Sequence, residues 1–155
     1  MSTAPFLDTL RHELEGMHRL SAILAEEFAG LGSADPDVLD QILRRKAAIL
    51  DDLQDTARSR AAALAAAGVE ASATGVESWL HATAGAQGAK LWTDLLAQTS
   101  AVHDLHRTNT ALLEGLMRHN RQSLDLLTRL ASPDLTYGAD GSTSGSFGTR
   151  NRGQA

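Results

Sequence analysis

One stretch of the chain constrains its fold more than any other, because leucines recur in it at helical spacing from about Leu91 to Leu130. Two asparagines, Asn109 and Asn120, interrupt this apolar stripe, and the stretch ends before Pro133. Roughly 40 helical residues would extend about 60 Å. A helix of this length with one apolar face is typical of proteins that pair with another helix. We therefore predict a binding protein and not a protein that holds a small substrate.

The composition predicts an all-α fold. Hydrophobic residues make up 43% of the 155 residues, but aromatic residues only 4%. The chain is therefore rich in Leu and Ala, which are strong helix formers, and no segment alternates with the period of two of a strand. We expect an antiparallel helical hairpin plus a long third helix, which together form an elongated, coiled-coil-like three-helix bundle.

The first helix is expected over about residues 4–31, where apolar residues recur at spacings of three and four. Charged residues, among them Glu13 and Glu27, fall between them, and we expect these on the solvent side. Gly32 and Ser33 follow and end the helix. The apolar stripe comprises Leu7, Leu10, Leu14, Met17, Leu20, Leu24, Phe28 and Leu31.

The second helix is expected over about residues 36–67. Asp35 is placed to cap its N-terminus, Pro36 suits the first turn, and Gly68 is placed at its C-terminal end. Lys46 falls within its apolar face, where the long stem of this residue would carry the charge out to water. The face comprises Leu39, Ile42, Leu43, Ile49, Leu50, Leu53 and Leu64. Because the connection to the first helix is short, the two helices should pack antiparallel.

Glycines interrupt the pattern between residues 69 and 88, where we expect one short helix near 76–84. Trp79 within it is interpreted as a packing anchor. A third long helix should then cover about residues 89–131. We expect residues 1–133 to form one helical domain and residues 134–155 to form a flexible, disordered tail rich in Ser and Gly.

The chain contains only parts of the residue sets that form catalytic or metal sites in enzymes. Glu15 and His18 match the Glu-x-x-His spacing of di-iron bundles, but the second such motif is missing. His103 and His106 share a helix face without an evident third metal ligand. We predict that the protein is not an enzyme and has no cofactor and no metal site.

The charge and hydropathy of the chain argue against a nucleic-acid-binding protein, a membrane protein and a secreted protein. A formal charge of −5 disfavours nucleic acid, since phosphate binding needs clustered cations. No apolar run approaches the roughly 20 residues that span a bilayer, and the start of the chain does not resemble a secretory signal. Cysteine is absent. We expect a cytoplasmic protein without membrane insertion.

The apolar stripe of the third helix is broader than a two-stranded seam. Its members are Val102, Leu105, Asn109, Leu112, Leu116 and Asn120, widened by Leu113, Met117, Leu124 and Leu127. For the first half of the helix, an intramolecular core and a partner-binding face both remain open. For the half after Leu112 we favour contact with a partner, because the first two helices are shorter and would leave it uncovered.

Three segments of the chain resemble the FlgN-type flagellar export chaperones. The second helix carries an apolar-Lys-apolar pattern at Ile42, Lys46 and Ile49. Residues 106–113 are similar to the family's Asn-x-x-Asn-Gly-x-Leu-Ile segment, with His106 in place of the first Asn and Thr110 in place of Gly. Residues 135–141, Leu-Thr-Tyr-Gly-Ala-Asp-Gly, are similar to the Leu-Tyr-Gly-x-x-Gly ending.

The resemblance implies a cytosolic chaperone that binds the C-terminal helical segments of hook-associated (hook–filament junction) proteins. It further implies that these clients are kept from premature assembly or degradation and are delivered to the flagellar type III export apparatus. We expect the side chain of Tyr137 to dock only once a partner is present. The expected client face consists of Asn109, Leu112, Leu113, Leu116, Met117, Asn120, Leu124 and Leu127.

Two other interpretations of the same pattern remain open. One is another small helical flagellar regulator or filament-cap chaperone, which would share the acidic all-α profile. The other is a structural coiled-coil protein that only self-associates, which the heptad stripe of the first helix favours.

Overall fold

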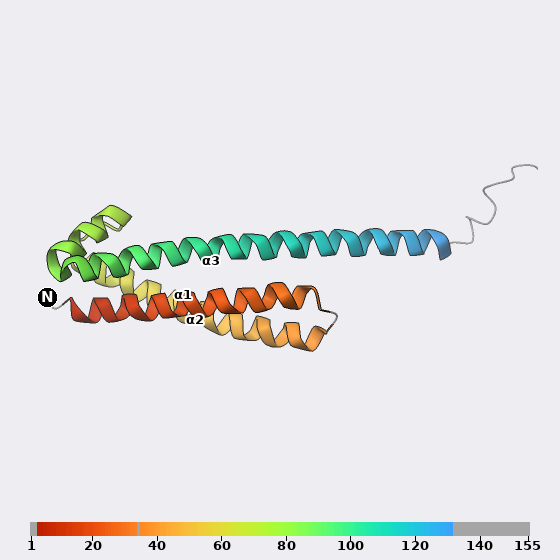
Figure 1. Ribbon diagram of the computed structural model, residues 1–155, viewed down its shortest axis with the longest axis horizontal. Helices are drawn as coiled ribbons and strands as arrows, with labels where there is room; N and C mark the ends of the chain where they lie inside the picture. The colour runs from red at the N-terminus through yellow and green to blue at the C-terminus, as the bar shows by residue number, and fades with distance from the viewer. Residues whose placement is uncertain (1–2, 34, 132–155) are drawn as a thin grey trace, which may run out of the picture. The chain divides into compact units, whose positions relative to one another are not determined.

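The computed structural model describes residues 3–33 and 35–131, which form three helices (Figure 1). Helix α1 covers Ala4–Leu31, α2 covers Pro36–Ala66, and α3 covers Ala73–Ala131. No strand occurs in these two ranges, which confirms the all-α prediction. The predicted tail, residues 134–155, lies outside them. The chain divides into two compact units, Met1–Gly115 and Leu116–Ala155, which are described separately below.

Helices α1 and α2 form the predicted antiparallel hairpin (Figure 1). The Asp35 side chain accepts a hydrogen bond from the backbone N–H of Asp37 at 3.0 Å, and Pro36 occupies the first helical position. Such a cap satisfies one of the backbone donors that have no partner within the helix. The predicted start of the second helix is thereby confirmed.

Gly68 ends α2, as predicted, in a left-handed conformation with φ of 66°. The backbone N–H of Val69 bonds to the carbonyl of Leu64, and that of Gly68 bonds to the carbonyl of Ala65. This pair of bonds is the Schellman motif, which requires a positive φ that glycine adopts without strain. Leu64 and Val69 also pack into the same apolar cluster, so this turn directs the chain back toward α1.

Helix α3 begins at Ala73, earlier than the expected start near residue 89, and it includes the segment predicted as a separate short helix. The break between the two parts is confined to Gly85, with φ of 67° and ψ of −165°, a region that only glycine occupies readily. Gly88 had suggested a further interruption, but it lies inside the helix. A Cβ there would lie only 2.6 Å from the Ala84 Cβ, so this glycine permits close packing.

The first unit holds two apolar clusters between its helices. One joins the start of α1 to the beginning of α3, where the rings of Phe6 and Trp79 meet edge to face at 5.0 Å. The packing role predicted for Trp79 is thereby confirmed. The other cluster contains Leu24, Ile42 and Val102, one from each helix. The clusters account for why all three helices in this unit are amphipathic.

Two carboxylates predicted on the solvent side of α1 are instead buried, Glu13 at 3% exposure and Glu27 at 7%. Helix α1 is covered by both α2 and α3, so a wider arc of its surface is buried than a single seam would require. Each carboxylate meets a cation from α2. Arg60 binds Glu13 through two hydrogen bonds of 2.7 and 3.2 Å, and its guanidinium lies 5.5 Å from the ring centroid of Trp92.

Candidate partner-binding surfaces

Large apolar side chains are exposed along the described helical part of the second unit, residues 116–131. Their exposed fractions range from 36% for Leu116 to 70% for Leu130. Exposed leucines that recur at helical spacing mark an interaction surface more often than isolated ones do. We call the set formed by Leu116, Leu124 and Leu127, with Asn120 among them, the leucine face. These four positions follow one another at spacings of four, four and three and therefore share one side of the helix.

The predicted client residues differ in how far the structure exposes them. Met117 is exposed beside the leucine face, while Leu113 is exposed and Leu112 half-buried in the first unit. Tyr137 lies outside the described residues. Asn109 is the exception among the predicted set, because it is buried at 3% exposure. Asn109 therefore belongs to the intramolecular core, which was one of the two alternatives for this half of the helix. We remove Asn109 from the client face.

Asn109 is buried because its amide connects α3 to α1. Its Nδ2 donates hydrogen bonds to the backbone carbonyl of Leu24 at 2.8 Å and to Oε2 of Glu27 at 2.7 Å. The other carboxylate oxygen of Glu27 accepts a hydrogen bond from Nζ of Lys46 at 2.8 Å. We had expected the long stem of Lys46 to carry its charge out to water. The ammonium group instead pairs with Glu27 inside the first unit. One residue from each helix meets at this polar cluster.

Glu27 is the carboxylate of the polar cluster. Burial by itself raises its pKa, because it disfavours the carboxylate. The hydrogen bonds from Lys46 and Asn109 and the positive charge of Lys46 favour the carboxylate, and together they hold the pKa of Glu27 below its ordinary value. Lys46 and Glu27 are thus a paired and hydrogen-bonded ion pair within the first unit.

Two hollows lie beside the polar cluster in the first unit. One, of about 300 Å³, is lined by Leu20, Leu24, Lys46, Leu50, Thr99, Val102, His103 and His106. The other, of about 200 Å³, is lined by Glu27, Leu31, Leu39, Leu43, Lys46, His106, Asn109, Thr110 and Leu113. Because both include Lys46 and His106, we treat them as one surface and call it the three-helix groove.

This groove is not among the features predicted from the sequence, although the sequence contains one signal for it. Leu39, Leu43, Lys46 and Leu50 follow one another on α2 at spacings of four, three and four, which places them on one side of the helix. The three leucines belong to the apolar face predicted for the second helix. Leu43 and Leu50 are 46% and 44% exposed, so the fold leaves them available.

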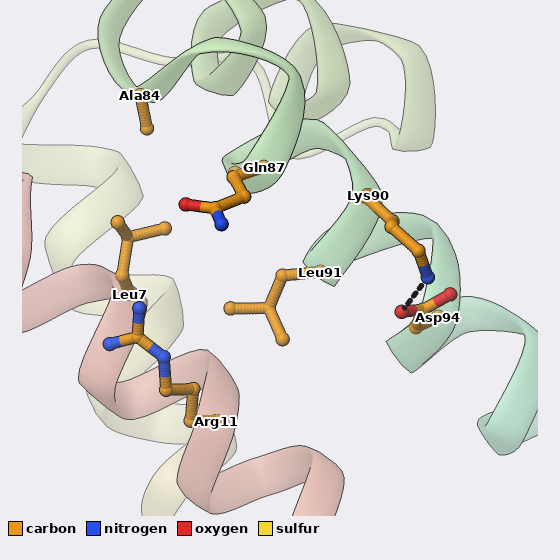
Figure 2. A pocket seen from close by; sticks show the side chains of 8 residues that line it. Leu7, Arg11, Ala84, Gln87, Lys90, Leu91 and Asp94 are labelled. Carbon is orange, nitrogen blue, oxygen red and sulfur yellow. Dashed lines mark hydrogen bonds and ion pairs between the residues drawn. The ribbon is translucent and has the colours of Figure 1, made fainter.

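A third hollow lies where the start of α1 meets α3, beside Gly88 (Figure 2). Its charged side chains have partners nearby. Lys90 pairs with Asp94 at 2.6 Å and Arg11 pairs with Asp8 at 2.6 Å. The dashed line in Figure 2 marks the pair of Lys90 and Asp94. Leu7 and Leu91 form the apolar part of its wall and pack against the core. We interpret this hollow as the edge of the helix packing.

The histidines and carboxylates that the structure describes do not converge into a metal site. Within residues 3–33 and 35–131, no group of three or more His, Cys, Asp or Glu side chains is arranged to hold a metal ion. His103 and His106 both line the three-helix groove instead. In the same ranges, no helix is long and apolar enough to cross a membrane.

These surfaces define the class of small all-α proteins that keep apolar helix faces exposed, an arrangement typical of proteins that bind helical segments of other chains. Comparison with known proteins narrows this class. The family described as FlgN protein matches residues 1–145, and the chain therefore belongs to the FlgN family. The resemblance inferred from the sequence is confirmed.

Two curated relatives bear the name flagella synthesis protein FlgN. Those of Salmonella typhimurium (strain LT2) and Salmonella typhi are each 41% identical to the chain over 56 residues, which is 36% of this chain. The match spans 39% of the length of each relative. No solved structure shows a significant match.

Proposed function

We propose that the protein is a cytoplasmic export chaperone for flagellum synthesis. In this proposal it binds the C-terminal helical segments of hook-associated (hook–filament junction) proteins, prevents their premature assembly or degradation, and delivers them to the flagellar type III export apparatus. Membership of the FlgN family supports the flagellar role. The observation that carries the binding role is the leucine face of the second unit, whose side chains stay exposed.

The energetics of the leucine face suit a reversible complex. Fully burying one leucine side chain contributes about 1.5–3 kcal/mol, so several leucines supply a substantial gross gain. A client segment that is disordered before binding loses conformational entropy when it becomes helical, which typically offsets about 2–5 kcal/mol of that gain. The net affinity is therefore moderate, and the client can be released for export.

The test replaces two leucines of the leucine face with charged residues. Leu116→Asp with Leu127→Asp should abolish co-purification of the C-terminal segments of hook-associated proteins, because a carboxylate would be buried unpaired in the apolar contact. The matched control is Leu126→Asp. Leu126 is similarly exposed but lies about 100° around the helix from Leu127.

Circular dichroism establishes that each variant remains helical, and light scattering gives the stoichiometry of the complex. A one-to-one complex with the unaltered chain and with the control, but not with the double variant, supports the proposal. Normal client binding by the folded double variant rules out the leucine face as the site. A chain that forms a discrete homo-oligomer and binds no client favours the self-associating alternative.

A further inference from the structure

We infer that the three-helix groove of the first unit is a second docking surface, which receives a client helix of about four turns with a carboxylate side chain in its apolar face. The inference rests on the proposed function, because the helix is taken to belong to the same client. It adds a location and a chemical requirement that the leucine face does not supply.

The shape of the groove suits one helix. Its floor is formed by Leu20 and Leu24 of α1, and its two walls come from α2 and α3. The lining positions on α3 run from 99 to 113, which corresponds to about 21 Å of helix, or about four turns. Three helices around an open groove leave the position that a fourth helix occupies in a four-helix bundle.

The walls of the groove carry apolar groups that the first unit does not bury. Leu43 and Leu50 on α2 are one heptad apart, and Leu113 lies on α3. All three are exposed by more than two fifths of their surface. An amphipathic helix with apolar side chains at spacings of three, four and seven would contact these positions along its length.

The polar groups of the groove define the charge of the occupant. Lys46 and His106 line both hollows, and His103 lines the larger one. Glu27 is the one carboxylate among the described residues of the lining, and both of its oxygens already accept hydrogen bonds, from Lys46 and Asn109. Within the described chain Lys46 makes this one hydrogen bond, although an ammonium group has three donors. The charge of Lys46 is paired with Glu27, but its two remaining N–H donors and the imidazole rings of His103 and His106 can donate hydrogen bonds to a carboxylate.

The first experiment measures the affinity of the full chain for fluorescently labelled C-terminal segments of hook-associated proteins by anisotropy. Leu43→Glu with Leu50→Glu should weaken binding by about tenfold or more, because two carboxylates then replace apolar contacts. The matched control is Phe28→Glu with Val38→Glu. Phe28 on α1 and Val38 on α2 are exposed to a similar extent, 49% and 43%, but they do not line the groove.

The second experiment tests the carboxylate. His106→Glu should weaken client binding about tenfold, whereas His106→Arg should leave the affinity unchanged or increase it, because a like charge repels and an opposite charge attracts. The same pair of changes at Thr110, an exposed residue of the same wall, should rank in the same order. This second position keeps the test valid if a change at His106 disturbs the neighbouring polar cluster.

The outcomes separate this inference from the proposed function. If the unaltered chain binds the client and the groove variants bind it equally well, the groove is not a docking surface and the proposed function stands. If the Arg variants bind more weakly than the Glu variants, the carboxylate requirement is wrong. If the unaltered chain binds no client segment, both proposals fall.

Discussion

Replacing Asn109 by alanine tests whether the polar cluster holds the three helices of the first unit together. The change removes the hydrogen bond to the Leu24 carbonyl and the bond to the Glu27 carboxylate, at 2.8 and 2.7 Å. A neutral hydrogen bond contributes about 1 kcal/mol and one to a charged group about 1.5–3 kcal/mol, and buried acceptors left without a donor add to the loss. We therefore expect the free energy of unfolding to fall by about 2–4 kcal/mol.

Urea denaturation followed by tryptophan fluorescence measures this change in the relevant unit, because Trp79 and Trp92 both lie within Met1–Gly115. Asn120→Ala is the matched control, since Asn120 is an exposed asparagine of the same helix. Exposed substitutions of this kind usually change stability by less than about 0.5 kcal/mol. Equal effects of the two substitutions would refute the role assigned to Asn109.

The same variant has a pH dependence with a defined sign. The pKa of Glu27 in the folded protein lies below its ordinary value of 4.5. A lowered pKa contributes stability that is present above the unfolded pKa and is lost as the pH falls through the folded pKa. Because Asn109 donates to the carboxylate form, the difference in stability between Asn109→Ala and the unaltered chain should be larger at pH 7 than at pH 3. A difference that grows toward acid would contradict this account.

Three further substitutions probe local features of the first unit, each by urea denaturation. Gly85→Ala should lower the free energy of unfolding by about 1–3 kcal/mol, since the backbone at this position suits only glycine; Gly32→Ala, at a negative φ, is its control. Asp35→Ala should cost about 1 kcal/mol through loss of the helix cap, and an unchanged midpoint would show that the cap is dispensable. Glu13→Ala should cost about 3 kcal/mol, because it leaves the largely buried guanidinium of Arg60 without its carboxylate. Recovery of stability in Glu13→Ala with Arg60→Met would support that reason, and no recovery would count against it.

The sequence predicted the features that depend on neighbouring residues. Asp35 and Pro36 mark the start of α2, and Gly68 marks its end, because caps and turns are satisfied within a few positions of the chain. The break at Gly85 was indicated by glycine content, but its confinement to one residue was not. Whether a glycine interrupts a helix or permits close packing depends on what lies against it, as Gly88 shows.

The burial of charge was not predictable from local pattern. Glu27 and Lys46 are 19 positions apart, and Glu13 and Arg60 are 47 apart, so the partner of each carboxylate is known only once the hairpin has formed. Taken alone, each of the four residues is typical of a solvent-facing position.

The candidate site was predicted only in part, for a related reason. The spacing of Leu116, Leu124 and Leu127 identifies an apolar helix side, but spacing does not tell whether that side is covered. The same ambiguity placed Asn109 on the client face, and it left open whether Leu43 and Leu50, on the apolar face of α2, are covered. Deciding between a covered and an exposed stripe requires the lengths and directions of the neighbouring helices.

The polar cluster around Asn109 also limits how the first unit can change shape. A slide of α3 along α1 by one helical turn, about 5.4 Å, would carry the amide away from the Leu24 carbonyl and from Glu27 at once. Such a ratchet would leave polar groups of two helices buried without partners, which is costly. The helices of this unit therefore form a fixed platform. Under the proposed function, the rearrangements of loading and release would fall on the exposed side chains and on the client itself.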